Sequence, residues 1–131
     1  MATFDDVRAI ASGLPEAIEG EHGHDHWPGW SVRGKAFVFE RQLRPKDIAD
    51  LERLEERVPS GEVIAVRVPK EEKEAVLATV SGAFDIPHFN GYPAVLVELD
   101  AIPVEELREL ITDAWIMQAP KRLAKAFLDG A

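Results

Sequence analysis

Cysteine is absent from this chain of 131 residues, and the chain has no long apolar run. Without a thiol there is no disulfide framework, no thiolate metal site and no cysteine nucleophile. No stretch approaches the roughly 20 consecutive apolar residues that a membrane-spanning helix needs. The first residues carry acids where a secretory signal carries bases followed by an apolar segment. We therefore expect a cytoplasmic location and no membrane partner.

Positive charge is also scarce, since 15 Lys and Arg stand against 24 Asp and Glu and give a net charge of −9. A negative protein is repelled by DNA, RNA and anionic membranes, which carry the same sign of charge. Hydrophobic residues make up 46% of the chain, which is too many for a disordered segment. We expect one domain over residues 1–131, long enough to bury about two-thirds of its unfolded surface.

Residue patterns predict an alternation of strands and helices. Apolar residues at helical spacing follow Thr3 and Asp6, which resemble a capping box, and predict a helix over 3–14. Period-two alternation predicts about three strands between 17 and 43, with a tight turn at Gly34. Helices are also expected over 45–58 and 69–80, and strands over 64–68 and 94–99. An ordered loop is expected over 84–92. After the last strand we expect a long helix that begins at 103 and a short helix that ends at 130. This order predicts an α+β fold, an antiparallel sheet with helices packed on one face.

Five stretches carry a resemblance to a known family: Thr3–Pro15, Trp30–Phe37, Pro87–Val97, Glu105–Leu110 and Ala119–Leu123. In this order they resemble the MmcQ/YjbR-like proteins over nearly the whole chain. The resemblance implies a bacterial protein with a frataxin-like (CyaY-like) α+β fold whose paired hairpins form a double wing. It also implies DNA binding, because the family is commonly given that label on the basis of its shape. It carries over no set of catalytic residues.

Basic residues gather in two stretches of this acidic chain. Residues 31–46 hold five bases and one acid, a net charge of +4, and residues 119–131 have a net charge of +2. The remainder therefore sums to −15. If the two stretches meet in space, they form a basic stripe suited to phosphates. The candidate nucleic-acid-binding residues are Arg33, Lys35, Arg41, Arg44, Lys121, Arg122 and Lys125. The alternative is that these side chains are simply solvated.

Three histidines at alternate positions, His22, His24 and His26, form the most unusual local composition. In an extended segment they would project to one side, and a His-x-His pair can supply two imidazoles to one metal ion. A closed site needs another ligand, and the sequence nominates none beyond the distant His88. We therefore favour three exposed histidines in a loop or at a strand end, with metal binding as the alternative.

The loop over residues 84–92 holds a second candidate site. His88 could act as a base beside Asn90 and Tyr92, but prolines and aromatic residues at this density more often lock a loop onto a sheet. If a ligand pocket exists, we expect it here, lined by Trp30, His88, Asn90 and Tyr92, and beside Trp27.

Nothing in the sequence nominates a reaction or a cofactor, so we expect a binding protein rather than an enzyme, with a monomer as its plausible state. Nucleic acid is the leading partner, because the resemblance and the two basic stretches agree. The alternatives are a small-molecule or metal-binding domain, and a protein-interaction module whose acidic surface meets a basic partner.

Overall fold

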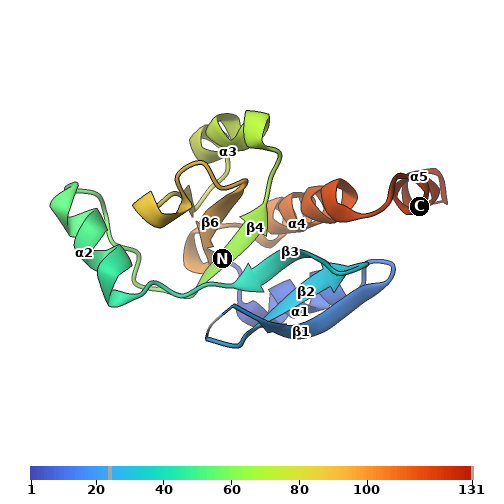
Figure 1. Cartoon of the computed structure of the whole chain (residues 1–131), viewed down its shortest axis with the longest axis horizontal. Coiled ribbons are helices and arrows are strands. Elements are labelled where there is room, and N and C mark those ends of the chain that lie inside the picture. The colour runs from blue at the N-terminus through green and yellow to red at the C-terminus, as the bar shows by residue number, and fades with distance from the viewer. Residues whose placement is uncertain (24, 131) are drawn as a thin grey trace.

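The computed structural model describes residues 1–23 and 25–130, which form one antiparallel sheet and the helices around it (Figure 1). The strands are β1 (Ala17–His22), β2 (Trp27–Val32), β3 (Lys35–Glu40), β4 (Val63–Arg67), β5 (Ala83–Phe84) and β6 (Ala94–Glu98). They lie side by side in the order β1-β2-β3-β4-β6-β5, and every neighbouring pair is antiparallel. The expected α+β fold with an antiparallel sheet is therefore confirmed. The two-residue β5 comes directly before the bulk of the expected loop.

The β2–β3 hairpin turns at Arg33 and Gly34, and Val32 pairs with Lys35 on either side of it. Both turn residues have positive φ, +49° and +82°. Two positive values are the signature of the two-residue turn whose twist matches that of paired strands. The turn predicted at Gly34 is thus confirmed, and Arg33 shares its left-handed backbone.

Five α-helices are described: α1 (Phe4–Ser12), α2 (Pro45–Arg53), α3 (Lys73–Thr79), α4 (Val104–Gln118) and α5 (Lys121–Gly130). Short 3₁₀ turns occupy Lys70–Glu72, Pro87–Phe89 and Leu99–Ala101. The predicted capping box is present, since Thr3 Oγ1 accepts from the Asp6 N–H at 3.2 Å and the Asp6 carboxylate accepts from the Thr3 N–H at 2.8 Å. Figure 1 shows α2 and α5 at opposite ends of the molecule.

The expected extent of α2 is wrong, because the helix ends at Arg53 and not at residue 58. Glu55 takes a left-handed backbone with φ of +58°, and the Glu56 N–H turns back to the carbonyl of Leu51 at 2.9 Å. Such a reversal satisfies carbonyls at a helix end and sends the chain away from the axis. The apolar spacing of Leu54 and Val58 suggested a longer helix, but Leu54 is half exposed.

The central strands are covered on both faces. Along β4, Ile64 and Val66 belong to the main core with α1 and α4, while Val63 and Ala65 point to the other face, as alternation requires. On that second face a smaller apolar cluster joins the strands to Leu51 of α2 and to Ile86 and Phe89. The helical layer expected on one face is therefore joined by a smaller layer on the other, because β4 and β6 are apolar at every position from Val63 to Val66 and from Ala94 to Val97.

Among the helices in residues 1–23 and 25–130, none has the length and apolar character needed to cross a membrane.

Candidate functional site

A cavity of about 250 Å³ lies beside the smaller apolar cluster, and its walls are mainly rings. We call it the ring pocket. Its lining comes from segments far apart in the sequence: His22, Gly23, Asp25 and Trp27 around the β1–β2 connection, Phe39, Glu40, Arg41 and Arg44 from β3 to α2, and His88, Phe89 and Tyr92 after β5. An apolar cavity with a few polar groups at its edge is the usual form of a small-ligand site.

The floor of the ring pocket depends on Gly29 of β2. The His22 ring stacks on Phe39, with 6.1 Å between ring centroids and 21° between planes. A Cβ at position 29 would lie 2.5 Å from His22 Cδ2 and 2.6 Å from the Phe39 Cβ. Only glycine leaves room for the imidazole to lie across the sheet at this point.

The opposite wall is the segment from Ile86 to Tyr92, in which Phe89 and Tyr92 meet edge to face at 5.1 Å. Lys73, the first residue of α3, holds this segment in place through its side chain. Its Nζ donates to the carbonyls of Phe89 at 2.7 Å and Tyr92 at 2.8 Å, and it pairs with Asp85 at 3.3 Å. The ammonium group is thus satisfied although the residue is only 8% exposed.

Sequence reasoning missed Lys73, because a lysine in the first turn of a helix has the same pattern whether it is solvated or buried. The expectation that the loop is locked against the sheet agrees with Phe89, which is 5% exposed within the second cluster. His88 itself is exposed and lies 6.0 Å from the Phe89 ring.

Three arginines lie over rings of this wall and its rim. The guanidinium carbon is 5.5 Å from the Phe89 centroid for Arg41, 5.8 Å from Trp27 for Arg44, and 5.1 Å from Tyr92 for Arg67. These distances are within the range of cation–π attraction. Arg41 and Arg44 line the pocket itself, and Arg67 contacts Tyr92 from outside the lining.

Carboxylates hold two of these arginines in place. Arg41 Nη1 lies 3.1 Å from Asp47 Oδ2, and both side chains are about 95% buried. Arg44 donates from Nε and Nη2 to Asp25 Oδ2 at 3.0 and 2.7 Å, at the half-exposed rim. The Asp47 carboxylate also accepts from the Arg44 N–H at 3.0 Å, so the start of α2 is tied to both arginines.

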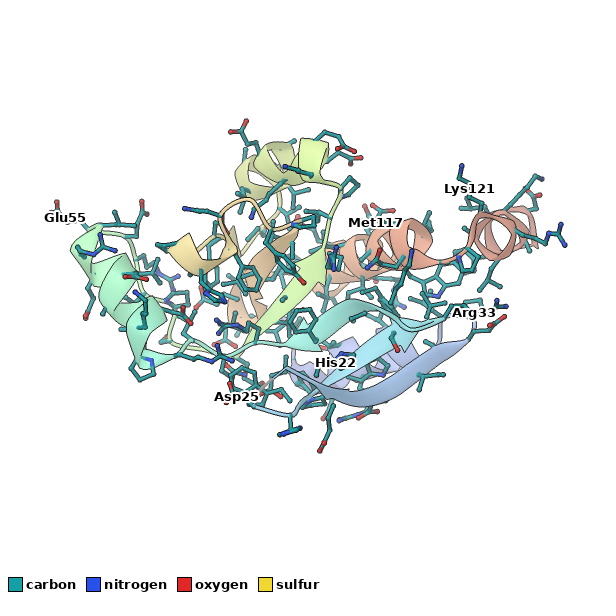
Figure 2. All side chains as sticks on the ribbon, viewed as in Figure 1. His22, Asp25, Arg33, Glu55, Met117 and Lys121 are labelled. Carbon is teal, nitrogen blue, oxygen red and sulfur yellow. The ribbon has the colours of Figure 1, made fainter. Side chains whose placement is uncertain are left out.

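The structure separates the seven candidate nucleic-acid-binding residues into two groups. Arg41 and Arg44 line the ring pocket. The other five lie on the β2–β3 turn and on α5, and Figure 2 shows Arg33 and Lys121 at the same end of the molecule. We call this second group the basic end; its members are Arg33, Lys35, Lys121, Arg122 and Lys125.

Acids partly compensate the basic end. Arg33 hydrogen-bonds Glu16, which lowers the pKa of the Glu16 carboxyl and raises the pKa of Arg33. Lys125 Nζ lies 2.6 Å from Asp129 Oδ2 one helical turn away. Lys35, Lys121 and Arg122 are exposed.

The four residues expected around a ligand pocket do not share one. His88 and Tyr92 line the ring pocket, but Trp30 lies on the other face of the sheet, fully buried in the main core. Its Nε1–H donates to Ser12 Oγ at 2.9 Å. Placing Trp30 in the pocket was wrong because odd displacements along a strand reverse the face, so Trp27 takes that role. Asn90 lines a different, larger groove.

His22 and His26 do not lie on one extended segment. β1 ends at His22, and the chain turns with positive φ at Gly23 (+73°) and His26 (+55°). His22 lines the ring pocket, while His26 Nδ1 lies 3.5 Å from Glu21 Oε1 in an exposed position. His24 lies outside the described residues. In the described part of the chain, no group of three or more His, Asp or Glu side chains is placed to hold a metal ion.

The larger groove, of about 590 Å³, runs along the end of α2, β5 and the following loop. Its most constrained polar group is Glu98, which accepts from Arg57 Nη1 at 2.6 Å and Nη2 at 3.1 Å. This bidentate pair lowers the pKa of Glu98, with further hydrogen bonds from the Ser60 and Gly61 backbone. The main polar feature of this groove is thus the Arg57–Glu98 ion pair, whereas the ring pocket is lined mainly by aromatic and histidine rings.

Fold and pocket together define an α+β protein with a small, ring-lined cavity. The YjbR family model matches residues 12–117, and the chain belongs to this family. It is 49% identical over 130 residues to the uncharacterised proteins Rv2570 of Mycobacterium tuberculosis and Mb2600 of Mycobacterium bovis. The matched region covers 98% of this chain and 97% of each relative.

A solved structure shares the fold. The Deinococcus radiodurans protein DR2400, with a DUF419 family-model domain, superposes with a TM-score of 0.58 at 19% identity. The match covers 89% of this chain and 78% of that one. At this identity the likeness concerns the fold alone, and the chemistry of the pocket rests on the residues of this chain.

Proposed function

We propose that this protein binds nucleotides by holding one base in the ring pocket. The observation that carries the proposal is that Trp27, His22, Phe39, Phe89 and Tyr92 line one open cavity, with arginines over three of the surrounding rings. Aromatic and guanidinium planes are the surfaces on which proteins stack unpaired bases, because every base has a flat π-face.

The size of the cavity limits the ligand. Its 250 Å³ is below the roughly 300–1,000 Å³ of pockets for drug-sized molecules. One ring system fits such a space, while a sugar and phosphate would extend beyond the rim. Arg44, whose side chain is 38% exposed beside Trp27, is the cation at that rim, and a phosphate there would compete with Asp25 for it.

The base can come from a free nucleotide or from single-stranded nucleic acid. The net charge of −9 favours a short ligand, because a strand leaving the pocket would cross an acidic surface. The basic end is the second surface that a longer strand could reach, through phosphate contacts from Lys35, Lys121 and Arg122. Binding of a strand should then weaken steeply with salt, whereas binding of a single nucleotide should weaken less.

Titrations of the whole chain test the proposal, with the four common ribonucleoside monophosphates in one arm and short single-stranded oligonucleotides in the other. Trp27→Ala should cost about 1–3 kcal/mol of binding free energy, the usual value of one stacked base. Ile18→Ala is the matched control, because Ile18 is exposed on β1 away from the pocket lining. Absence of saturable binding at about 1 mM, or equal affinity in the Trp27→Ala variant, would overturn the proposal.

A further inference from the structure

Arg44 is the cation that a group projecting from the ring pocket can reach. Two arginines line the cavity in the described part of the chain. The Arg41 side chain is only 6% exposed, whereas that of Arg44 is 38% exposed. The guanidinium carbon of Arg44 lies 5.8 Å from the ring centroid of Trp27, which lines the same cavity. This guanidinium is therefore both at the pocket wall and open to solvent.

A carboxylate already pairs with this guanidinium. Arg44 donates from Nε and Nη2 to a single oxygen of Asp25, Oδ2, at 3.0 and 2.7 Å. Asp25 lines the pocket from the connection between β1 and β2, and its side chain is 42% exposed. An ion pair with this exposure contributes little to stability, so it opens at low cost. A phosphate makes the same kind of charge-assisted contact with a guanidinium as a carboxylate does.

We propose that Arg44 binds the phosphate of the ligand, and that Asp25 occupies this phosphate position in the absence of ligand. This rests on the proposed function and narrows its ligand class to nucleoside phosphates, in preference to nucleosides and free bases. A terminal phosphate carries a charge of about −1.5 to −2 near pH 7 and has three strong acceptor oxygens. It displaces the singly charged Asp25 from Arg44, whereas a ligand without a phosphate leaves the Arg44–Asp25 pair closed.

Uridine and uridine monophosphate, titrated into the unmodified protein, differ only in this group. We expect the monophosphate to bind at least about threefold more tightly, because its contact with Arg44 is stronger than the exposed ion pair that it replaces. If neither ligand binds, the proposed function fails. If the two bind with equal affinity, the base does enter the ring pocket but Arg44 does not bind the phosphate, and this inference alone is overturned.

Asp25→Asn tests the competition, because it keeps the size of the side chain and removes its charge. The monophosphate should bind about fivefold more tightly than to the unmodified protein, the effect of one unit charge at roughly 4 Å in water, and uridine should bind as before. Asp129→Asn is the matched control. It also removes a carboxylate from an ion pair, with Lys125 at 2.6 Å, but Asp129 is on α5 and does not line the pocket.

The control separates a local effect from a change in net charge. Asp129→Asn should leave both ligands unchanged. An equal gain for the monophosphate in both variants, or an equal gain for uridine and its monophosphate in Asp25→Asn, would overturn the role of Asp25.

Arg44→Met then assigns the phosphate contact, because it keeps an unbranched chain beside Trp27 and removes the charge. The advantage of the monophosphate over uridine should disappear while uridine still binds. Retention of the advantage in a folded Arg44→Met protein would overturn the assignment. Should this variant fail to fold, the Asp25→Asn comparison still tests the assignment, because Asp25 pairs with Arg44.

Discussion

The two faces of the sheet are packed to different degrees. On the main face, Trp30 and Trp115 are fully buried, and each indole N–H is satisfied within the protein, by Ser12 and by the Pro15 carbonyl. On the second face, Trp27 and Tyr92 remain partly exposed around a void. Helices α1 and α4 contribute many buried residues to the main core, whereas α2 contributes Leu51 alone to the buried residues of the smaller cluster, beside the loop after β5. A protein core has few voids, whereas a ligand site is a cavity between side chains, and the second face has such a cavity.

The largest expected effect on stability comes from a substitution that leaves a cavity in the main core. Trp115→Ala should lower the free energy of unfolding by about 3–5 kcal/mol, because a large buried ring is removed and a cavity remains. The ring also packs against Phe127 of α5 at 4.9 Å, so that contact is lost as well. Chemical denaturation with a fluorescence or circular-dichroism readout measures the change.

Trp27→Ala is the matched change on the second face. It should cost clearly less stability than Trp115→Ala, since Trp27 is already partly exposed. It should also weaken ligand binding by about 1–3 kcal/mol, the value of one stacked base. Equal losses of stability for the two tryptophans would mean that the second face is packed as tightly as the first, which would contradict the comparison.

Gly29→Ala should have a smaller effect on stability. It tests whether the second face needs a glycine at the point where the His22 ring lies over β2. The new methyl carbon would lie 2.5 Å from the His22 ring and 2.6 Å from the Phe39 Cβ, so the imidazole and the β3 chain at Phe39 must both shift. Overpacking of this kind costs about 1–3 kcal/mol, and binding in the ring pocket should weaken with it.

Gly20 provides the control, because it pairs with Gly29 across β1 and β2 and a Cβ there meets nothing within 4 Å. Gly20→Ala should leave ligand binding unchanged. If both variants bind equally well, the position of His22 is irrelevant to the pocket.

Local chemistry made much of the fold predictable from the sequence. The capping pair Thr3 and Asp6, the turn glycine at 34 and the strand alternation each depend on neighbours in the chain, and the structure confirms all three. The end of α2 was missed because the left-handed Glu55 has no residue-type signature.

The ring pocket was only half predictable, because it is assembled from segments that are distant in sequence. His88 and Tyr92 stood out by their loop, but their partners lie about 50 to 70 positions earlier, at His22, Trp27 and Phe39. No local pattern shows which face of the sheet each tryptophan of β2 takes, so the sequence predicts both Trp27 and Trp30 at the pocket, and only Trp27 lines it. Burial of Arg41 depends on Asp47 and Phe89 together, and neither spacing nor composition reveals it.

Acidification should weaken the second face through Glu98. Arg57 lowers the pKa of this carboxyl from its ordinary value of 4.5, so ionised Glu98 stabilises the folded state above that pH. The stabilisation should be lost as the pH falls below 4.5 and through the folded pKa. Unfolding free energies measured over this range should show the gap between the unmodified protein and Glu98→Gln closing as the pH falls. The exposed Glu52 serves as control, and a gap that widens on acidification would contradict the assigned role.

The smallest expected effect is at the basic end, and it tests whether this surface belongs to the ring pocket at all. Lys121→Ala and Arg122→Ala should each change the free energy of unfolding by no more than about 0.5 kcal/mol, because both side chains are exposed at the start of α5. Mononucleotide binding should not change, since the proposed function places the base in the ring pocket, whose lining includes neither residue. Binding of a longer single strand should weaken and its salt dependence should become shallower by about one unit of slope for each phosphate contact removed. A loss of mononucleotide binding in these variants would show that the two surfaces act as one, and that the incomplete face alone does not define the binding site.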